Sequence, residues 1–287
     1  MKKGRASRTA EWVALSRAYA TLDEAEDKVC DDPIALSYLN PALRACVHSM
    51  RFGPVHALAQ RALHLSPFLG NGLYVPARVA FIDQALLRRL DRGLDQLVLL
   101  GAGFDSRAER LRGDLRGVTI FEIDFPSTQE RKLAMRPPAP GVRYLPLDLA
   151  AQPFARALRA AGFDPAKRSA FIWEGVIYYL TREAAAQVLD DIRGLLAPGG
   201  GLMLDYLLDV PALRGPLLAA AVALFGAVGE PVHTRLRPDE VAPFFEGHGF
   251  AIEDHAETGE LERRYLRGRN AGVKLPPIYG CLDLAAR

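Results

Sequence analysis

The chain has 287 residues, 49% of them hydrophobic, which is enough to bury a sizeable core in one large domain or two small ones. Its 36 Lys and Arg residues against 34 Asp and Glu residues give a formal net charge of +2, a balance that argues against nucleic acid or a membrane as the main partner. Its three cysteines, Cys30, Cys46 and Cys281, lie far apart, so we expect reduced thiols in a cytoplasmic protein, with no disulfide and no metal site. We also expect no secretory leader and no membrane span. The basic amino terminus does not run into an apolar stretch, and the longest apolar run, 217–228, is shorter than the roughly 20 residues that cross a bilayer.

The first part of the chain, from residue 8 to about 62, carries no strand signal and has the spacing of helices. Its apolar residues at helical spacing include Trp12, Leu15, Ala18, Tyr19 and Leu22. The run Asp31-Asp32-Pro33 has the form of a helix start, with an acidic cap before proline. A further helix is predicted over 76–90, after a turn at Gly70-Asn71-Gly72. We therefore predict a helical cap or lid over residues 1–92.

From residue 97 onward, short apolar runs alternate with helix-compatible segments, which predicts β-α-β units and the parallel sheet of an α/β fold. The predicted strands are 97–100, 118–123, 142–146, 170–173, 202–206 and 250–254, with a closing stretch at 277–284. The predicted helices are 106–111, 127–135, 153–161, 182–196 and 237–247. Residues 93–287 form one predicted catalytic core, with an acceptor-side insertion near 208–236. The apolar segment 213–228 within it is read as core or a dimer interface, or as a lid over an acceptor.

The first predicted strand ends in a loop that fits a ligand-binding turn. Gly101 and Gly103 let the backbone turn sharply and approach a ligand without interference from a Cβ atom. A dinucleotide fingerprint would place a third glycine where this chain has Ser106. The loop therefore favours a cofactor without a pyrophosphate.

Carboxylates follow the next three strands, at the sheet edge where open α/β folds bind ligands. Asp124 lies about 20 residues past the glycines, the usual distance for an acid that binds ribose hydroxyls. Asp124 and Asp148 could instead cap the helices that follow them. Glu174 ends an apolar run, so it must reach water, a protein partner or a ligand cation. The joint occurrence of the three acids indicates a nucleoside cofactor with a charged end.

Four motifs together resemble the leucine carboxyl methyltransferase family, over roughly residues 8–250. They are Leu-Gly-Ala-Gly-Phe-Asp-Ser-Arg, Phe-Glu-Ile-Asp-Phe-Pro followed by Lys132, Leu-Asp-Leu, and Glu-Gly-Val-Ile-Tyr-Tyr-Leu. The resemblance implies a Rossmann-like class I methyltransferase, with a mostly parallel seven-stranded sheet, helices on both faces and a helical amino-terminal cap. It also implies S-adenosyl-L-methionine as the cofactor and a small-molecule methyl acceptor, such as a polyketide.

The same resemblance implies roles for individual residues. Arg78 corresponds to an arginine that pairs with the carboxylate of the cofactor's methionine part, and Glu174 would face its amine. Asp124 would hold the ribose, and Arg17 matches a polar position of the cap only loosely. The other implied contacts are the two loop glycines and two residues beside the adenine: Gly101, Gly103, Asp148 and Leu149.

The chemistry asks little of the protein beyond alignment and exclusion of water. A carboxylate acceptor is already ionised at neutral pH and needs no general base, whereas a phenol benefits from one. The candidates for an acceptor-side role are Tyr178, Tyr179 and His233, each of which could also be structural.

Several alternatives stay open from the sequence. A protein's carboxyl-terminal carboxylate could be the acceptor, the chain could be a nicotinamide-dinucleotide-dependent oxidoreductase, or it could be an inactive cofactor-binding scaffold. We expect no nucleic acid or membrane partner, and we include a homodimer among the expected assemblies.

Overall fold

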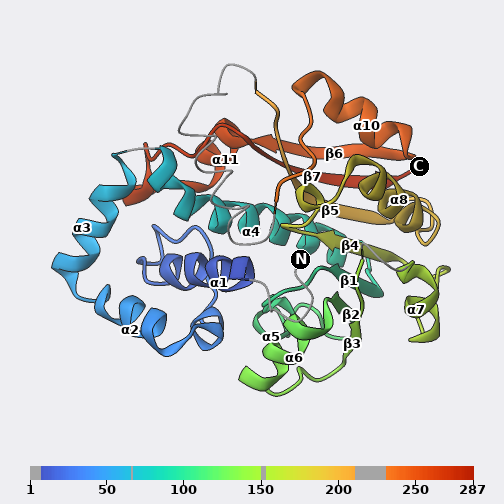
Figure 1. The fold of residues 1–287 in the computed structure, drawn as a ribbon, viewed down its shortest axis with the longest axis horizontal. Helices are drawn as coiled ribbons and strands as arrows, with labels where there is room; N and C mark the ends of the chain where they lie inside the picture. Colours follow the sequence, from blue (N-terminus) through green and yellow to red (C-terminus); the bar gives the residue numbers. More distant parts are fainter. Residues whose placement is uncertain (1–7, 66, 150–152, 211–230) are drawn as a thin grey trace.

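The computed structural model describes residues 8–65, 67–149, 153–210 and 231–287, and its centre is a single seven-stranded sheet (Figure 1). The strand order is β3-β2-β1-β4-β5-β7-β6. The strands are β1 (Gln96–Leu100), β2 (Thr119–Asp124), β3 (Val142–Pro146), β4 (Ser169–Trp173), β5 (Gly201–Leu207), β6 (Phe250–Glu257) and β7 (Tyr279–Ala286). Neighbours from β3 to β5 are parallel, and β7 is antiparallel to both β5 and β6. The predicted α/β fold with a mostly parallel seven-stranded sheet is confirmed.

Helices precede the sheet and flank it. Those before the sheet are α1 (Arg8–Ala20), the 3-10 helix η1 (Ala35–Tyr38), α2 (Pro41–Ser49), α3 (Gly53–Leu63) and α4 (Pro67–Asp91). The flanking helices are α5 (Arg107–Arg110), α6 (Pro126–Met135), α7 (Phe154–Ala160), η2 (Ile177–Tyr179), α8 (Arg182–Arg193), η4 (Pro238–Glu240), α10 (Val241–Gly247), α11 (Thr258–Tyr265) and η5 (Gly268–Asn270). In Figure 1, α5 and α6 lie beside the β1–β3 half of the sheet, and α8 and α10 lie beside the β5–β6 half.

The central strands form because most of their residues are apolar, as strands covered on both faces require. Every residue of β1, β4 and β5 is buried, whereas the edge strand β3 has one buried residue among its five. Helix α8 buries Ala185, Val188, Leu189 and Ile192, which recur at the three- and four-residue spacing of one helix face. Thr181 caps that helix by accepting a hydrogen bond from the Ala184 N–H at 3.3 Å.

Two predictions before the sheet are wrong in detail. The residues Gly70-Asn71-Gly72 lie inside α4 rather than in a turn, and Pro76 lies in the interior of that helix rather than at its start. Gly70 serves close packing instead, because a Cβ atom there would lie 2.1 Å from the Lys274 carbonyl oxygen. The packing of α4 against β4, β5 and β7 outweighs the cost of an interior proline.

The run Asp31-Asp32-Pro33 does not begin an α-helix. The chain turns after it into the short 3-10 helix η1. Asp32 still acts as a cap, because its Oδ1 accepts hydrogen bonds from the Ile34 and Ala35 N–H groups at 3.2 and 3.1 Å. The apolar segment 213–228, read as core, interface or lid, lies outside the described residues.

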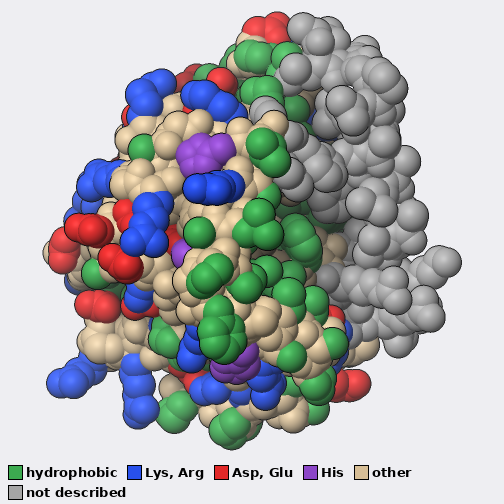
Figure 2. Space-filling model, turned by 90° about the vertical axis from the view of Figure 1, so that its left-hand side faces the viewer, with side chains coloured by type: hydrophobic (Ala, Val, Ile, Leu, Met, Phe, Trp, Pro, Cys, Tyr) green, Lys and Arg blue, Asp and Glu red, His purple; other side chains and the backbone are tan. Residues whose placement is uncertain are grey.

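Helix α3 exposes apolar side chains and buries a polar one. Its one buried residue is Gln60, whose side-chain amide donates to Asp23 at 2.9 Å. Phe52 and Leu58 are 70% exposed, and Figure 2, which views the side of the molecule formed by α2 and α3, shows hydrophobic and basic side chains across its middle. Exposed apolar patches of this kind are typical of interaction surfaces. The expected homodimer itself stays a prediction.

Candidate active site

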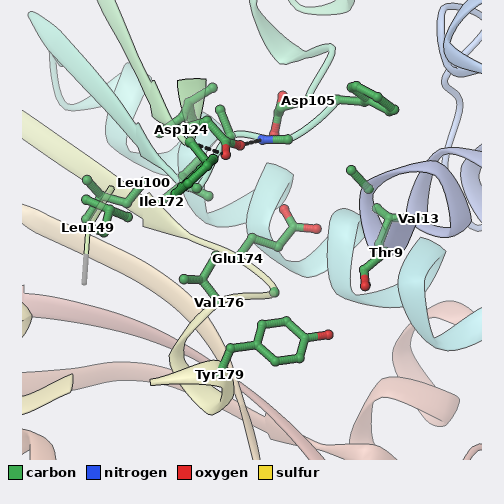
Figure 3. A pocket seen from close by; sticks show the side chains of 18 of the residues that line it. Thr9, Val13, Leu100, Asp105, Asp124, Leu149, Ile172, Glu174, Val176 and Tyr179 are labelled. Atoms are coloured by element: carbon green, nitrogen blue, oxygen red, sulfur yellow. Dashed lines mark hydrogen bonds between the residues drawn. The ribbon is translucent and has the colours of Figure 1, made fainter. Parts of the chain in front are cut away.

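A cavity of about 290 Å³ lies at the carboxyl ends of the parallel strands. Residues after β1, β2, β3 and β4 line one side, and Thr9, Ala10, Val13 and Arg17 of α1 line the other. In Figure 3, Asp124 and Leu149 lie on the strand side, Thr9 and Val13 lie opposite, and the carboxylate of Glu174 points into the space between them. This is the sheet edge at which the sequence predicts a ligand site.

The glycine loop after β1 forms the floor of the cavity. Gly101 and Gly103 have φ values of +66° and +52°, in the region that glycine adopts without strain. A Cβ atom on Gly101 would lie 2.4 Å from Cγ2 of Val176, so the loop also needs glycine for space. The predicted sharp turn is found at both positions, and the approach to a ligand stays a prediction.

Asp124 ends β2 and lies directly against that loop. Its Oδ2 accepts a hydrogen bond from the Gly103 N–H, and its Oδ1 accepts one from the Phe125 N–H at 2.5 Å. These bonds fix the orientation of a carboxylate that also lines the cavity. Each carboxylate oxygen has a second lone pair that can accept from a ligand hydroxyl.

Arg78 and Glu174, which come from α4 and from the loop after β4, form an ion pair at the cavity wall. Arg78 Nε donates to Glu174 Oε1 at 2.9 Å, and the two side chains are 3% and 11% exposed. Arg78 Nη1 also donates to Asp205 at 2.8 Å. Burial opposes ionisation of Glu174, but the guanidinium groups of Arg107 and Arg78 outweigh it and hold its pKa below the usual range. Both groups are therefore charged at neutral pH.

Arg107 is a part of the site that the sequence reasoning missed. Its side chain is 1% exposed, its Nε donates to Asp83 at 2.7 Å, and its Nη1 forms an ion pair with Asp105. Nη1 also lies 2.7 Å from Oε2 of Glu174, but the geometry is not that of a hydrogen bond, so Oε2 is buried without a donor. The available signal was an arginine inside the glycine loop's own motif, too close to a buried strand to remain solvated.

The amino-terminal cap is attached to the loop through buried polar contacts. Arg17 donates to the Phe104 carbonyl at 2.6 Å and pairs with Asp32 at 2.9 Å. Ser106, at the place of the absent third glycine, donates to Asp32 at 2.6 Å. Arg17 therefore lines the cavity and also holds α1 over it.

The other candidates divide between the cavity and the core. Asp148, Leu149, Tyr179 and His233 line the cavity. Tyr178 is buried outside the lining, with its ring packed edge-on against Tyr179 at 4.7 Å. Its carbonyl accepts from the His233 N–H at 2.8 Å, which fixes the backbone of that histidine beside the cavity.

Metal and disulfide chemistry receive no support from the described residues. Within the described ranges no group of three or more His, Cys, Asp or Glu side chains could hold a metal ion. Cys30 and Cys281 are buried and Cys46 is exposed, and all three are free thiols. Among the helices that the structure describes, none is both long and apolar enough to cross a bilayer.

The family model described as leucine carboxyl methyltransferase matches residues 10–193. The chain belongs to the leucine carboxyl methyltransferase family. A relative from Mycobacterium leprae is 36% identical over 194 residues, covering 64% of this chain and 63% of that relative. One from Mycobacterium marinum is 32% identical over 257 residues, covering 85% of this chain and 72% of that relative. Both carry the name "Putative S-adenosyl-L-methionine-dependent methyltransferase". The aligned part of this methyltransferase thus spans less than two thirds of the first relative's length.

A solved structure shows the same fold. A DUF574 family protein from Streptomyces avermitilis superposes with a TM-score of 0.61 at 14% sequence identity, over 98% of each chain. With the membership above, the class I methyltransferase fold is confirmed and the nicotinamide-dependent alternative is set aside.

The relatives are named for S-adenosyl-L-methionine, and the cavity has groups that match this molecule. Its methionine end carries an ammonium and a carboxylate, which match the buried Oε2 of Glu174 that lacks a donor and the guanidinium of Arg78. Its nucleoside has hydroxyls that match Asp124 and an aromatic base whose ring face can pack against Leu149.

Proposed function

We propose that this methyltransferase transfers the methyl group of S-adenosyl-L-methionine to an oxygen of a small metabolite, a carboxylate or a phenol such as one of polyketide origin. The observation that carries the proposal is the pair of opposite buried charges, Arg78 and Glu174, at one end of a cavity that α1 covers. When bound, the cofactor supplies an electrophilic methyl group on a sulfonium leaving group. The protein's task is then to bind, align and exclude water.

The cofactor roles follow from the contacts of each residue. The guanidinium of Arg78 binds the methionine carboxylate, and Oε2 of Glu174 accepts from the ammonium. Asp124, held by the two backbone N–H groups, accepts from the ribose hydroxyls. Asp148 and Leu149, which follow β3, flank the adenine along the same wall of the cavity.

The acceptor binds toward Tyr179 and His233, two lining residues to which no cofactor contact is assigned. A carboxylate acceptor is nucleophilic without a base, because it is ionised at neutral pH. A phenol acceptor would use His233 as the base, since it is the one histidine in the described lining of the cavity. Tyr178 packs outside the lining, so we assign it no direct role.

A small acceptor is favoured over the carboxyl terminus of a protein. The cavity of about 290 Å³ lies near the lower end of the roughly 300–1,000 Å³ typical of small-molecule sites. Four residues of α1 line the side of it opposite the strand ends, which narrows the space left for an acceptor.

Thermal denaturation with added ligands tests the cofactor assignment. A ligand that binds only the folded state raises the melting temperature as its concentration passes the Kd. S-adenosylhomocysteine should raise it, NAD should not, and Asp124→Ala should weaken the effect without unfolding the chain. A stabilisation by NAD alone would refute the proposal.

A methyl-transfer assay with labelled cofactor tests the acceptor class. Candidate acids and phenols are supplied separately, and the products are treated with mild base, which cleaves a methyl ester but leaves a methyl ether intact. Label transferred only to the carboxyl terminus of an added peptide, and to no small acid or phenol, would instead support the protein-methylating alternative.

A further inference from the structure

Asp205 is a buried carboxylate that neither the motifs nor the cavity lining includes. It lies within β5, a strand in which every residue is buried, and its side chain is 0% exposed. A charge in such a place is costly unless it is paired and hydrogen-bonded. The identity of its partners therefore indicates why this strand contains an acid.

Two of those partners, Arg78 and Gly175, line the cavity where the proposed methionine end is held. Asp205 Oδ2 accepts from Arg78 Nη1 at 2.8 Å and from the Tyr74 hydroxyl at 2.9 Å. Its Oδ1 accepts from the Gly175 N–H at 2.6 Å. One carboxylate thus connects α4, β5 and the loop that carries Glu174.

These contacts fix the orientation of two groups. Arg78 is held through Nη1 by Asp205 and through Nε by Glu174, so its planar guanidinium cannot rotate about its bond to the chain without breaking one of them. Gly175 has a φ of +74°, and a Cβ atom there would lie 3.4 Å from Arg78 Nη1. The loop beside Glu174 is therefore held against the guanidinium.

We propose that Asp205 is a positioning residue for the amino-acid end of the cofactor, acting through Arg78 and Gly175 without touching the cofactor. The inference rests on the proposed function, because it assigns that end of S-adenosyl-L-methionine to Arg78 and Glu174. It predicts that neutralising Asp205 weakens recognition of the amino-acid end and leaves recognition of the nucleoside unchanged.

The test compares two ligands that share a nucleoside and a sulfur. S-adenosylhomocysteine carries the amino-acid end, and 5′-deoxy-5′-methylthioadenosine lacks it. Isothermal titration of Asp205→Asn should give an affinity for S-adenosylhomocysteine at least tenfold below wild type, with the affinity for methylthioadenosine within twofold. The asparagine keeps an acceptor for the Gly175 N–H but removes the negative charge opposite Arg78.

Asp283→Asn is a matched control. Asp283 is a buried acid of β7, 1% exposed, whose Oδ1 accepts from Arg89 Nε of the same helix α4 at 3.1 Å. It lies outside the described lining of the cavity. This variant loses a comparable buried charge pair, yet the ratio of the two affinities should stay at the wild-type value.

The outcomes separate this inference from the proposed function. Failure of the wild-type protein to bind S-adenosylhomocysteine would overturn the proposed function. If the wild-type protein binds normally and Asp205→Asn lowers the affinity for both ligands equally, or lowers neither affinity, the inference alone is overturned. If that variant does not fold, Tyr74→Phe, which removes one hydrogen bond to the same Oδ2, should lower the affinity for S-adenosylhomocysteine selectively. An unchanged affinity ratio in Tyr74→Phe would then refute the positioning role.

Discussion

Arg78→Lys is the substitution that tests the charge arrangement of the cavity most directly. Arginine contacts Glu174 through Nε and Asp205 through Nη1, at 2.9 and 2.8 Å. Lysine keeps the charge but has a single ammonium, which cannot reproduce a contact that uses two edges of a planar group. One of the two buried carboxylates therefore loses its hydrogen bond to position 78.

The expected cost follows from what each carboxylate retains. Asp205 keeps Tyr74 and Gly175, and Glu174 keeps the charge of Arg107 nearby, so neither is left without a partner. The loss is then one charge-assisted hydrogen bond, about 1.5–3 kcal/mol in the free energy of unfolding. A similar loss toward the cofactor carboxylate lowers the affinity for S-adenosylhomocysteine roughly 10- to 150-fold.

Urea unfolding without ligand measures the first quantity, and isothermal titration of the folded variant measures the second. Arg88→Lys is the control on the same helix, because Arg88 also contacts two carboxylates, Asp254 at 3.3 Å and Asp283 at 3.2 Å, but is 41% exposed. It should cost less than about 1 kcal/mol and leave ligand affinity unchanged. An Arg78→Lys protein that binds S-adenosylhomocysteine within twofold of wild type would refute the assignment of Arg78 to the cofactor.

Three further substitutions test other parts of the site. Gly101→Ala should abolish measurable binding of S-adenosylhomocysteine, because its Cβ atom would lie 2.4 Å from Val176 and because alanine is strained at a positive φ. Gly117→Ala is the control for backbone strain alone, since Gly117 has a φ of +88° and its Cβ atom would meet nothing within 4 Å. It should leave binding of S-adenosylhomocysteine unchanged. Glu174→Gln should destabilise the chain at pH 7 in urea unfolding. The pKa of Glu174 is lowered in the folded chain, so its charge stabilises the fold at a pH above its unfolded pKa of about 4.3, and this stabilisation is lost as the pH falls below that value. The difference in free energy of unfolding between variant and wild type should therefore become smaller at low pH. A difference that does not depend on pH would contradict this. Tyr179→Phe should change the KM or kcat for the acceptor without changing the Kd for S-adenosylhomocysteine, and a change confined to the cofactor Kd would place this ring on the wrong ligand.

The strands could be predicted closely because the information is local. The predicted strand 142–146 coincides with β3, and the predicted strand 97–100 differs from β1 by one residue. In β1 the signal is an apolar run that ends at glycine, and it is contained within a few residues. The insertion of β7 between β5 and β6 could not be predicted in this way, since pairing across the sheet depends on contacts far apart in sequence.

The errors in α4 have the same physical origin. Judged from their neighbours in sequence alone, Gly70 predicts a turn and Pro76 predicts the first residue of a helix. In the folded chain Gly70 packs so closely against the Lys274 carbonyl that no Cβ atom would fit between them. The helix continues through Pro76 because it packs against other elements of the fold. Tertiary packing therefore overrides the local signal.

The site shows a similar division. Glu174 was identified because a carboxylate after a buried strand needs a partner, and the structure supplies Arg78, which lies 96 residues away in sequence. Asp205, which lies 127 residues from Arg78, carries no local signal of its role, and the place of Arg107 in the glycine-loop motif does not show which groups it contacts. Sequence reasoning found several of the residues that line the cavity and missed Asp205 and Arg107, which hold two of them in place.

The pairing of Arg78 with Glu174 also bears on how the cofactor is selected. Two opposite charges at a cavity wall would destabilise the ligand-free chain if each were buried alone, and their ion pair removes that cost. A zwitterionic amino-acid end can take up both partners together, offering a carboxylate to the arginine and an ammonium to the glutamate. A ligand with only one of these charges would draw one side chain out of the ion pair and leave the other without the charged partner that it has in the free protein. The wall is therefore expected to favour ligands that carry both charges over ligands that carry only one.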